Sequence, residues 1–317
     1  MALTHVFPFD PTYGYDLATL LSLEAPAAPD DFEPFWRETY RQARQVPLRL
    51  SRRAVKSPSG DLELFEVEFD SLGGARIGAW VTWPRQGRVS RGVVVGHGYG
   101  GRDAADLTVA GPPGAAIFPC ARGFHRSANA KWPDVSTTHV VHGVESRETY
   151  IHRGCVADYW AAASALIELV PEAAGQLDYM GCSFGGGIGA LMLPWDDRFR
   201  RAFLDVPSFG NHPLRLQAPC VGSGEAVREY YQKDPEVVQV LRYFDSASAA
   251  RFIRIPVMVA AALFDPAVPP QGQFSVYNAL AGPKELFVHE AAHFSHPNEV
   301  AENQRLNQAL DDWFSKR

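Results

Sequence analysis

Two short stretches of the chain carry side chains that can perform chemistry. Residues 181–185 read G-C-S-F-G, and residues 289–297 read H-E-A-A-H-F-S-H-P, which holds three of the ten histidines. A serine beside a histidine base can attack an acyl carbon. Two histidines four residues apart on one face of a helix can instead bind zinc, with the intervening glutamate as a base. The surrounding sequence has to decide between these two chemistries.

The context of Ser183 favours the serine chemistry. G-x-S-x-G is a weak pattern by itself, but here it follows a short strand at 177–181 and opens a small-residue helix at 184–193. A nucleophile elbow needs this strand–turn–helix setting, because the sharp turn exposes the serine hydroxyl. Gly186 and Gly187 would let the helix lie close to the sheet. We therefore predict that Ser183 is a nucleophile.

The acid and the base of such a site should follow the serine in the order acid, then histidine. Asp265 directly follows the most apolar strand, at 257–264, and Asp205 is its competitor after an earlier strand. His293 lies in the middle of the next loop and is the predicted base. His289 continues a strand, and His296 precedes Pro297 as the expected capping residue of the last helix.

An oxyanion hole needs backbone N–H groups aimed at the developing negative charge. The residue after the nucleophile, Phe184, should supply one. The H-G-Y-G-G loop at 97–101 follows an apolar strand, and Tyr99 is its best candidate for the second donor. His97 in the same loop is expected to make a structural hydrogen bond.

The zinc interpretation fits the sequence poorly. The first histidine of H-E-A-A-H abuts a strand, and Pro297 stands four residues after the second. A long helix that places both histidines on one face does not fit this setting. The zinc interpretation also does not account for the elbow, the glycine loop or Asp265. We therefore expect no metal site.

Alternating strand and helix patterns predict the elements that must position these residues. Continuous apolar strands with intervening helices indicate a mostly parallel sheet covered on both faces, as in an α/β-hydrolase. We expect a single domain over 1–317 with an N-terminal helical extension over about 1–55. The expected strands are 64–69, 75–83, 92–96, 114–120, 177–181, 201–206, 255–264 and 284–289, and the clearest helices cover 29–43, 156–170, 184–193 and the region of Leu306, Leu310 and Trp313.

Composition narrows the class of protein further. The net charge of −6, without a lysine- and arginine-rich block, argues against nucleic acid as a partner. We find no signal peptide and no apolar run long enough to cross a membrane. Four cysteines without metal-binding spacing indicate a cytoplasmic protein with reduced thiols.

The chain resembles the acetylxylan esterase and cephalosporin C deacetylase family of α/β-hydrolases almost from end to end. The resemblance rests on HGYGGRD, ARGF, HGVESRETYIHR, GCSFGGG, LDVPSF, VLRYFD, LFDPAVPP and GPKEL, which occur in the family's order. It implies a triad of Ser183, Asp265 and His293, an oxyanion hole from the N–H groups of Tyr99 and Phe184, and a homo-oligomer, typically a hexamer.

Three phenylalanines depart from the family pattern. Phe124, Phe184 and Phe294 stand where the family usually has polar residues. If these rings line the pocket, with Tyr99, Phe124 and Phe294 as substrate-binding residues, the site should prefer a more apolar alcohol or acyl group over a polar sugar. The alternative is that the same rings belong to the core.

The sequence thus predicts a serine esterase that hydrolyses short-chain acyl (acetyl) esters and deacetylates carbohydrate-like substrates such as acetylated xylo-oligosaccharides or cephalosporin C. It needs no cofactor, and its partner is a small-molecule ester. The alternatives are a hydrolase of the same fold that cleaves a peptide or a dienelactone, a zinc metalloprotease, and a non-catalytic binding protein on the same scaffold.

Overall fold

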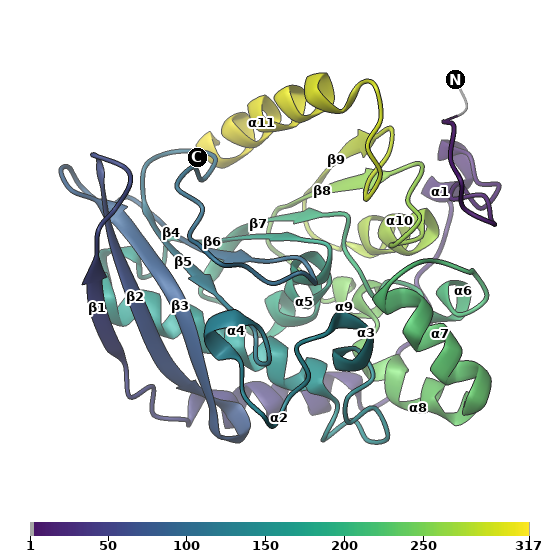
Figure 1. Ribbon diagram of the computed structural model, residues 1–317, viewed down its shortest axis with the longest axis horizontal. Helices are drawn as coiled ribbons and strands as arrows, with labels where there is room; N and C mark the ends of the chain where they lie inside the picture. Colours follow the sequence, from purple (N-terminus) through teal and green to yellow (C-terminus); the bar gives the residue numbers. More distant parts are fainter. Residues whose placement is uncertain (1–2, 317) are drawn as a thin grey trace.

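The strands form one mixed sheet that runs through the molecule (Figure 1). The computed structural model describes residues 3–316. Across the sheet the strands follow the order β1-β2-β3-β5-β4-β6-β7-β8-β9. In chain order they are β1 (Ser51–Val55), β2 (Leu62–Ser71), β3 (Ala75–Pro84), β4 (Gly92–Gly96), β5 (Ala115–Pro119), β6 (Leu177–Cys182), β7 (Phe199–Asp205), β8 (Val257–Ala262) and β9 (Lys284–His289).

The sheet is antiparallel at one side and parallel through the rest. β1 pairs antiparallel with β2, β2 with β3, and β3 with β5. From β5 through β4, β6, β7 and β8 to β9, every neighbouring pair is parallel. The predicted mostly parallel sheet is therefore confirmed. Its parallel strands end at one common edge, so the loops that follow β4, β6, β8 and β9 can meet there.

Strand sequences match their degree of burial. β5 and β8 are buried along their whole length, as their continuous apolar sequences predict for strands covered on both faces. In β7, Phe203 packs into a different cluster from its neighbours Ala202 and Leu204. Successive side chains of a strand point to opposite faces, so each face of the sheet has its own apolar layer.

Helices cover both faces, as predicted. Figure 1 shows α11 on the opposite side of the sheet from α4 and α5. Leu306, Leu310 and Trp313 of α11 pack on Phe203 and Met258 of the sheet. No helix within residues 3–316 has the length and apolarity needed to cross a bilayer. The helices are α1 (Leu17–Leu21), α2 (Phe32–Arg44), α3 (Ser136–His139), α4 (Ile151–Leu169), α5 (Phe184–Met192), α6 (His212–Arg215), α7 (Ser223–Lys233), α8 (Val238–Leu241), α9 (Ser246–Ala250), α10 (Pro270–Ala279) and α11 (Glu299–Ser315).

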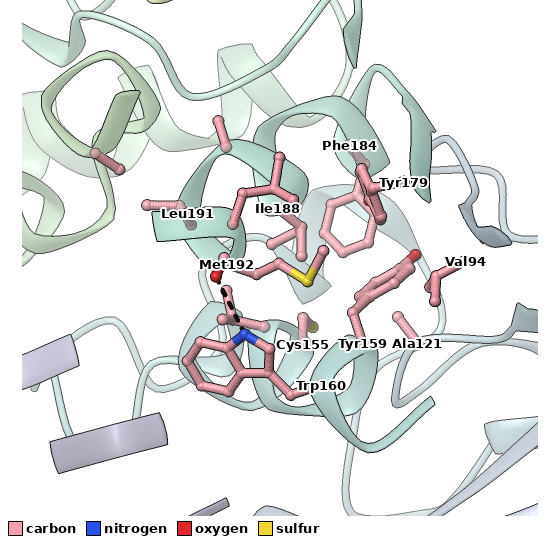
Figure 2. Close-up of a cluster of buried hydrophobic side chains, with 14 of the residues drawn as sticks. Val94, Ala121, Cys155, Tyr159, Trp160, Tyr179, Phe184, Ile188, Leu191 and Met192 are labelled. Atoms are coloured by element: carbon pink, nitrogen blue, oxygen red, sulfur yellow. Dashed lines mark hydrogen bonds between the residues drawn. The ribbon is translucent and has the colours of Figure 1, made fainter. Parts of the chain in front are cut away.

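The core beneath the elbow is built between α4 and α5 (Figure 2). The side chains of Tyr159 and Trp160 on α4 and of Ile188 and Met192 on α5 are at most 1% exposed. The indole N–H of Trp160 donates to the carbonyl oxygen of Met192 at 3.1 Å, which ties the two helices together. Because α5 begins at the residue after Ser183, this packing also fixes the position of the turn at Ser183.

The N-terminal part departs from the expectation in one respect. The predicted helix at 29–43 is present as α2, but Ser51–Val55 form the edge strand β1 and not part of a helical extension. Four of the five β1 residues are exposed, and its sequence, S-R-R-A-V, lacks the apolar alternation of a half-buried strand. β1 therefore forms a strand because it pairs with β2, and not because of its own sequence pattern.

Helix α2 packs on the main body through the buried residues Phe32, Trp36 and Thr39, of which Trp36 is the largest. Trp36 is fully buried, and its indole N–H donates to the carbonyl oxygen of Tyr243 at 2.8 Å. Its ring also lies edge-on to those of Trp160 and Phe244.

We predict that Trp36→Ala lowers the free energy of unfolding by about 3–5 kcal/mol, because it removes a large buried ring and leaves a cavity. Denaturant titration measures the change. The matched control is Arg37→Ala, whose side chain is 63% exposed and which should change stability by less than about 1 kcal/mol. Equal effects of the two substitutions would contradict this account of α2.

Candidate active site

Ser183 sits in the sharp turn between β6 and α5, as the elbow prediction requires. Its backbone has φ +53° and ψ −110°, a conformation that a residue with a side chain rarely adopts. Three hydrogen bonds hold it there. The Ser183 N–H donates to the carbonyl oxygen of Asp205 at 2.8 Å, and its own carbonyl accepts from the N–H groups of Gly187 and Ser208, both at 3.0 Å.

The glycine after the serine-phenylalanine pair permits the close approach of α5 to the sheet. A Cβ atom on Gly185 would lie 2.9 Å from the backbone of Gly96 and from the carbonyl oxygen of His97. That is closer than real Cβ contacts, so a larger residue would push α5 away from β4. The motif therefore reflects the packing of α5 on the sheet as well as the sharp turn at the serine.

His293 reaches the nucleophile, and Asp265 reaches His293. The Nε2 atom of His293 is 3.1 Å from the Ser183 hydroxyl oxygen, and its Nδ1 atom is 2.9 Å from Oδ2 of Asp265. An ionised carboxylate only accepts hydrogen bonds, so Nδ1 carries the proton and Nε2 is free to accept from the serine. The three residues thus form a relay from acid to imidazole to hydroxyl.

Asp265 is fully buried in a cage of donors. The N–H groups of Ala267 and Val268 both donate to Oδ1 at 2.9 Å, and the Gln273 side-chain amide donates to Oδ2 at 2.9 Å. Gln273 was not identified from the sequence, because a glutamine eight residues beyond the acid belongs to no motif. Its carbonyl accepts from the N–H of Ala262 at 2.8 Å, so the end of β8 fixes its orientation.

The environment of His293 alters its proton affinity. Burial favours the neutral imidazole, but the hydrogen bond to Asp265 and the negative charge of that carboxylate outweigh burial and raise the pKa of His293 above its ordinary value. The imidazole is therefore a stronger base than a free histidine.

The competing acid, Asp205, pairs with a different histidine. Its Oδ1 atom is 3.1 Å from Nε2 of His289, and Nδ1 of His289 is 2.9 Å from Oε1 of Glu302. Burial opposes the positive charge, yet hydrogen bonds to both carboxylates raise the pKa of His289. His289 is thus occupied between two acids, and the geometry separates it from the Ser183–His293 pair.

His296 is not the capping residue that the sequence suggested. The N-cap of α11 is Asn298, and the His296 side chain is buried, with Nε2 3.6 Å from Oε1 of Glu302. Only its backbone serves the helix start, since its carbonyl oxygen accepts from the N–H of Glu299 at 3.1 Å.

The H-E-A-A-H motif does not lie on a helix. His289 ends β9, and residues 290–298 form the loop before α11. His289 and His293 turn to different carboxylates, so they do not share the helical face that the zinc motif needs. Within residues 3–316, no three histidine, cysteine or acidic side chains are grouped so that they could hold a metal ion.

The two predicted oxyanion donors lie at the start of α5 and in the loop after β4, which are joined by a backbone hydrogen bond. Phe184 is the first residue of α5, so no carbonyl within the helix can accept its N–H. Tyr99 follows β4, and the carbonyl of His97 in the same loop accepts from the N–H of Gly185 at 2.9 Å. His97 also accepts the N–H of Ala121 through Nε2 at 3.0 Å, as its expected structural role requires.

Burial lowers the pKa of His97 to about 3, so its ring is neutral. A neutral ring that accepts through Nε2 carries its proton on Nδ1, which donates to the carbonyl of Gly98 at 2.6 Å. The loop that presents the Tyr99 N–H is therefore fixed by His97 from both sides.

The side chains of Tyr99 and Phe124 make their contacts with buried histidines of the core. The Tyr99 hydroxyl lies 3.1 Å from Nδ1 of His139 and 2.9 Å from Nε2 of His152. Phe124 is 3% exposed, and its ring lies 4.6 Å from that of His139. The ring of Phe124 is enclosed in the core, as is that of Phe184, which favours the alternative that these rings belong to the core. Substrate contact by Phe124 stays a prediction.

Phe294 differs from these two phenylalanines because it is only partly buried. It directly follows His293 and lies 5.0 Å from the ring of Phe264, the residue before Asp265. A substrate-binding role for Phe294 stays a prediction.

A cavity of about 230 Å³ adjoins the same loop on the side of β7 and α11. Its lining residues include Cys182, Asp205, His289, His293, Phe294, His296 and Glu302. The side of the loop that faces this cavity is therefore polar, and it includes the group of His289, Asp205 and Glu302.

Solved structures share this fold over nearly the whole chain. An acetyl xylan esterase from Paenibacillus sp. R4 superimposes with a TM-score of 0.77 at 22% identity and covers 93% of this chain and 100% of that one. Acetyl xylan esterase 1 from Thermoanaerobacterium sp. JW/SL YS485 gives 0.77 at 20% identity, with 95% and 99% covered. An acylaminoacyl peptidase gives 0.60 at 13% identity over 81% of this chain and 42% of that one. At these identities the likeness shows an α/β-hydrolase fold.

Sequence comparison is more specific. The acetyl esterase Axe7A of Xylanibacter ruminicola is 21% identical over 280 residues, which are 82% of this chain, and the chain spans 62% of the length of that relative. The sequence pattern of the acetyl xylan esterase family, AXE1, matches residues 21–311. This match includes the elbow, the loop of Asp265 and the loop of His293, and the chain accordingly belongs to the acetyl xylan esterase (AXE1) family.

Proposed function

We propose that the chain is a serine esterase that removes acetyl and other short acyl groups from carbohydrate-like alcohols. The observation that carries the proposal is the relay in which His293 lies 3.1 Å from the Ser183 hydroxyl and 2.9 Å from Asp265, at a strained elbow. Membership of the family and the names of its relatives support acetyl esters as the substrate class.

In the first half of the proposed reaction, the Ser183 oxygen attacks the ester carbonyl carbon while Nε2 of His293 takes its proton. The negative charge that develops on the carbonyl oxygen is stabilised by the N–H groups of Tyr99 and Phe184. The bond to the alcohol then breaks, and His293 returns the proton to the leaving oxygen. Asp265 holds the imidazole and stabilises its charged form.

In the second half, a water molecule attacks the acyl-serine, His293 takes the proton of this water, and the acid is released as Ser183 regains its proton. Every proton transfer uses groups already present in the chain, so the proposal includes no cofactor. Gln273 acts through Asp265 and is a positioning residue in this scheme.

We also propose that the protein is cytoplasmic and forms a homo-oligomer, a hexamer on the family resemblance. Support for a reducing compartment comes from the cysteines, since Cys120, Cys155, Cys182 and Cys220 are all unpaired. Cleavage of a peptide or of a dienelactone remains a less favoured alternative, because the likeness to a peptidase extends only to the fold.

We predict that Ser183→Ala abolishes the release of acetate from acetylated xylo-oligosaccharides and from ethyl acetate, with kcat falling by about 10⁴- to 10⁶-fold. A fluorophosphonate probe should label one site on the parent protein and none on the variant. Thermal unfolding checks that the variant is folded. Turnover near the parent rate in a folded Ser183→Ala protein would rule out the serine mechanism.

We predict opposite outcomes for the two histidines of the loop. His293→Ala should lose activity to a similar extent as Ser183→Ala but unfold near the parent temperature, because its side chain is partly exposed. His289→Ala should keep most of its kcat and lose stability by about 1–3 kcal/mol, since Asp205 and Glu302 would lose the imidazole that hydrogen-bonds to both. An inactive, folded His289→Ala together with an active His293→Ala would reverse the assignment.

The raised pKa of His293 predicts the acid limb of the pH profile. Only the neutral imidazole can accept the serine proton, so kcat/KM should fall as the pH drops through an apparent pKa above about 6.5, the ordinary value for histidine. Asp265→Asn should move this limb to lower pH and reduce kcat by about 10⁴-fold. An acid limb that Asp265→Asn leaves in place would show that another group controls it.

A further inference from the structure

Over the described residues 3–16, the chain before α1 contains no helix or strand, runs past the loops of Asp265 and His293, and turns at residues 11–14. Residues 3–13, called here the aromatic strap, alternate along their length: odd positions from Leu3 to Pro11 are at least partly buried, and even positions from Thr4 to Asp10 are exposed. Figure 1 shows the segment beside α10 and the loop after β9. It lies outside residues 21–311, the part that matches the family pattern.

The strap contacts both loops that carry the acid and the base. The ring of His5 lies 5.4 Å from that of Phe264, and the ring of Phe7 lies 6.0 Å from that of Phe294. Phe264 and Phe294, which precede Asp265 and follow His293, are themselves 5.0 Å apart. The strap therefore packs on the two phenylalanines adjacent to the relay.

Polar contacts fix the far end of the strap. The N–H of Asp265 donates to the carbonyl oxygen of Pro11 at 3.1 Å, and the Tyr13 hydroxyl donates to the carbonyl oxygen of Pro219 at 2.9 Å. The rings of Phe7, Phe9 and Tyr13 follow one another at 5.7 and 5.9 Å. A series of rings is thereby anchored at the acid and extends toward the base.

The position of the strap relative to His293 indicates which part of the substrate it meets. In the proposed mechanism His293 returns its proton to the leaving oxygen, so the alcohol part of the ester lies on the His293 side of Ser183. The His293 side chain is 30% exposed, and Phe7, Phe9 and Phe294 are only partly buried. Because Phe294 directly follows His293 and Phe7 packs on Phe294, these two rings present apolar surface on that side.

We propose that the aromatic strap forms an apolar wall for the alcohol part of the substrate, so that the enzyme favours esters whose alcohol carries an aromatic ring over those with a small alkyl alcohol. This inference rests on the proposed esterase function and specifies its substrate class. Stacked or edge-to-face ring pairs contribute enough to change kcat/KM by about 2- to 10-fold for one ring.

Benzyl acetate and ethyl acetate are suitable probes. They share the acetyl group, their leaving alcohols have similar acidity, and only benzyl alcohol carries an aromatic ring. In Phe7→Ala we expect the ratio of kcat/KM for benzyl acetate to that for ethyl acetate to fall by about 2- to 10-fold. The rate on ethyl acetate should stay near that of the parent protein. Val6→Ala is the matched control, because the neighbouring Val6 side chain is 98% exposed, and it should leave the ratio unchanged.

Phe7→Leu keeps most of the apolar volume and tests the ring if Phe7→Ala fails to fold. It should lower the same ratio in the same direction. A ratio that stays unchanged in the folded Phe7 variants, or equal losses on both esters, would overturn the strap proposal while leaving the esterase function intact. Failure of the parent protein to hydrolyse either ester, or full activity in Ser183→Ala, would instead overturn the proposed function.

Discussion

The conformation of Ser183 is the constraint around which the rest of the site is arranged. A serine at φ +53° and ψ −110° costs on the order of 1–3 kcal/mol, so the surrounding structure must hold it there. The Ser183 N–H is bound by the end of β7, and its carbonyl is bound by the first turn of α5 and by Ser208. These bonds form only if α5 lies close to the sheet, which the glycine at 185 permits. The glycines at 185, 186 and 187 therefore permit the packing that holds Ser183 in its strained conformation.

A second constraint is the separation of two histidine–carboxylate groups on one loop. His289 and His293 are four residues apart, and each has its own acid. His289 ends β9 and stays in the plane of the sheet, where Asp205 at the end of β7 and Glu302 on α11 enclose it. His293 has φ +48°, which turns its side chain away from that group. The loop conformation, more than the residue type, decides which histidine reaches the serine.

Much of this arrangement could be predicted from the sequence. Buried parallel strands have continuous apolar sequences, so β4, β6 and β8 and the residues that follow them could be located, and with them Ser183 and Asp265. The parts that could not be predicted depend on tertiary contacts. β1 is a strand only because it pairs with β2, and the role of Gln273 is visible only from its hydrogen bond to Asp265.

The ring of Phe124 illustrates the same limit. Its place in the sequence suggested a pocket wall, but its exposure is decided by Tyr99, His139 and Phe184, which lie far apart in the chain and close around it. A substitution pattern shows which positions have lost polarity. It does not show whether the new ring faces substrate or core, because that depends on the neighbours that the fold supplies.

The strap links the start of the chain to the acid of the relay. The Asp265 side chain already accepts four hydrogen bonds, and its own N–H is satisfied by Pro11, so the acid is bound by donors and acceptors from three separate parts of the chain. A buried N–H without a partner is costly, and the strap removes that cost at the residue that orients His293. The same segment brings Phe7 to Phe294. One short segment therefore serves both the order of the acid loop and, as we propose, the choice of alcohol, and this is consistent with the aromatic rings at its inward positions His5, Phe7 and Phe9, since its outward positions carry none.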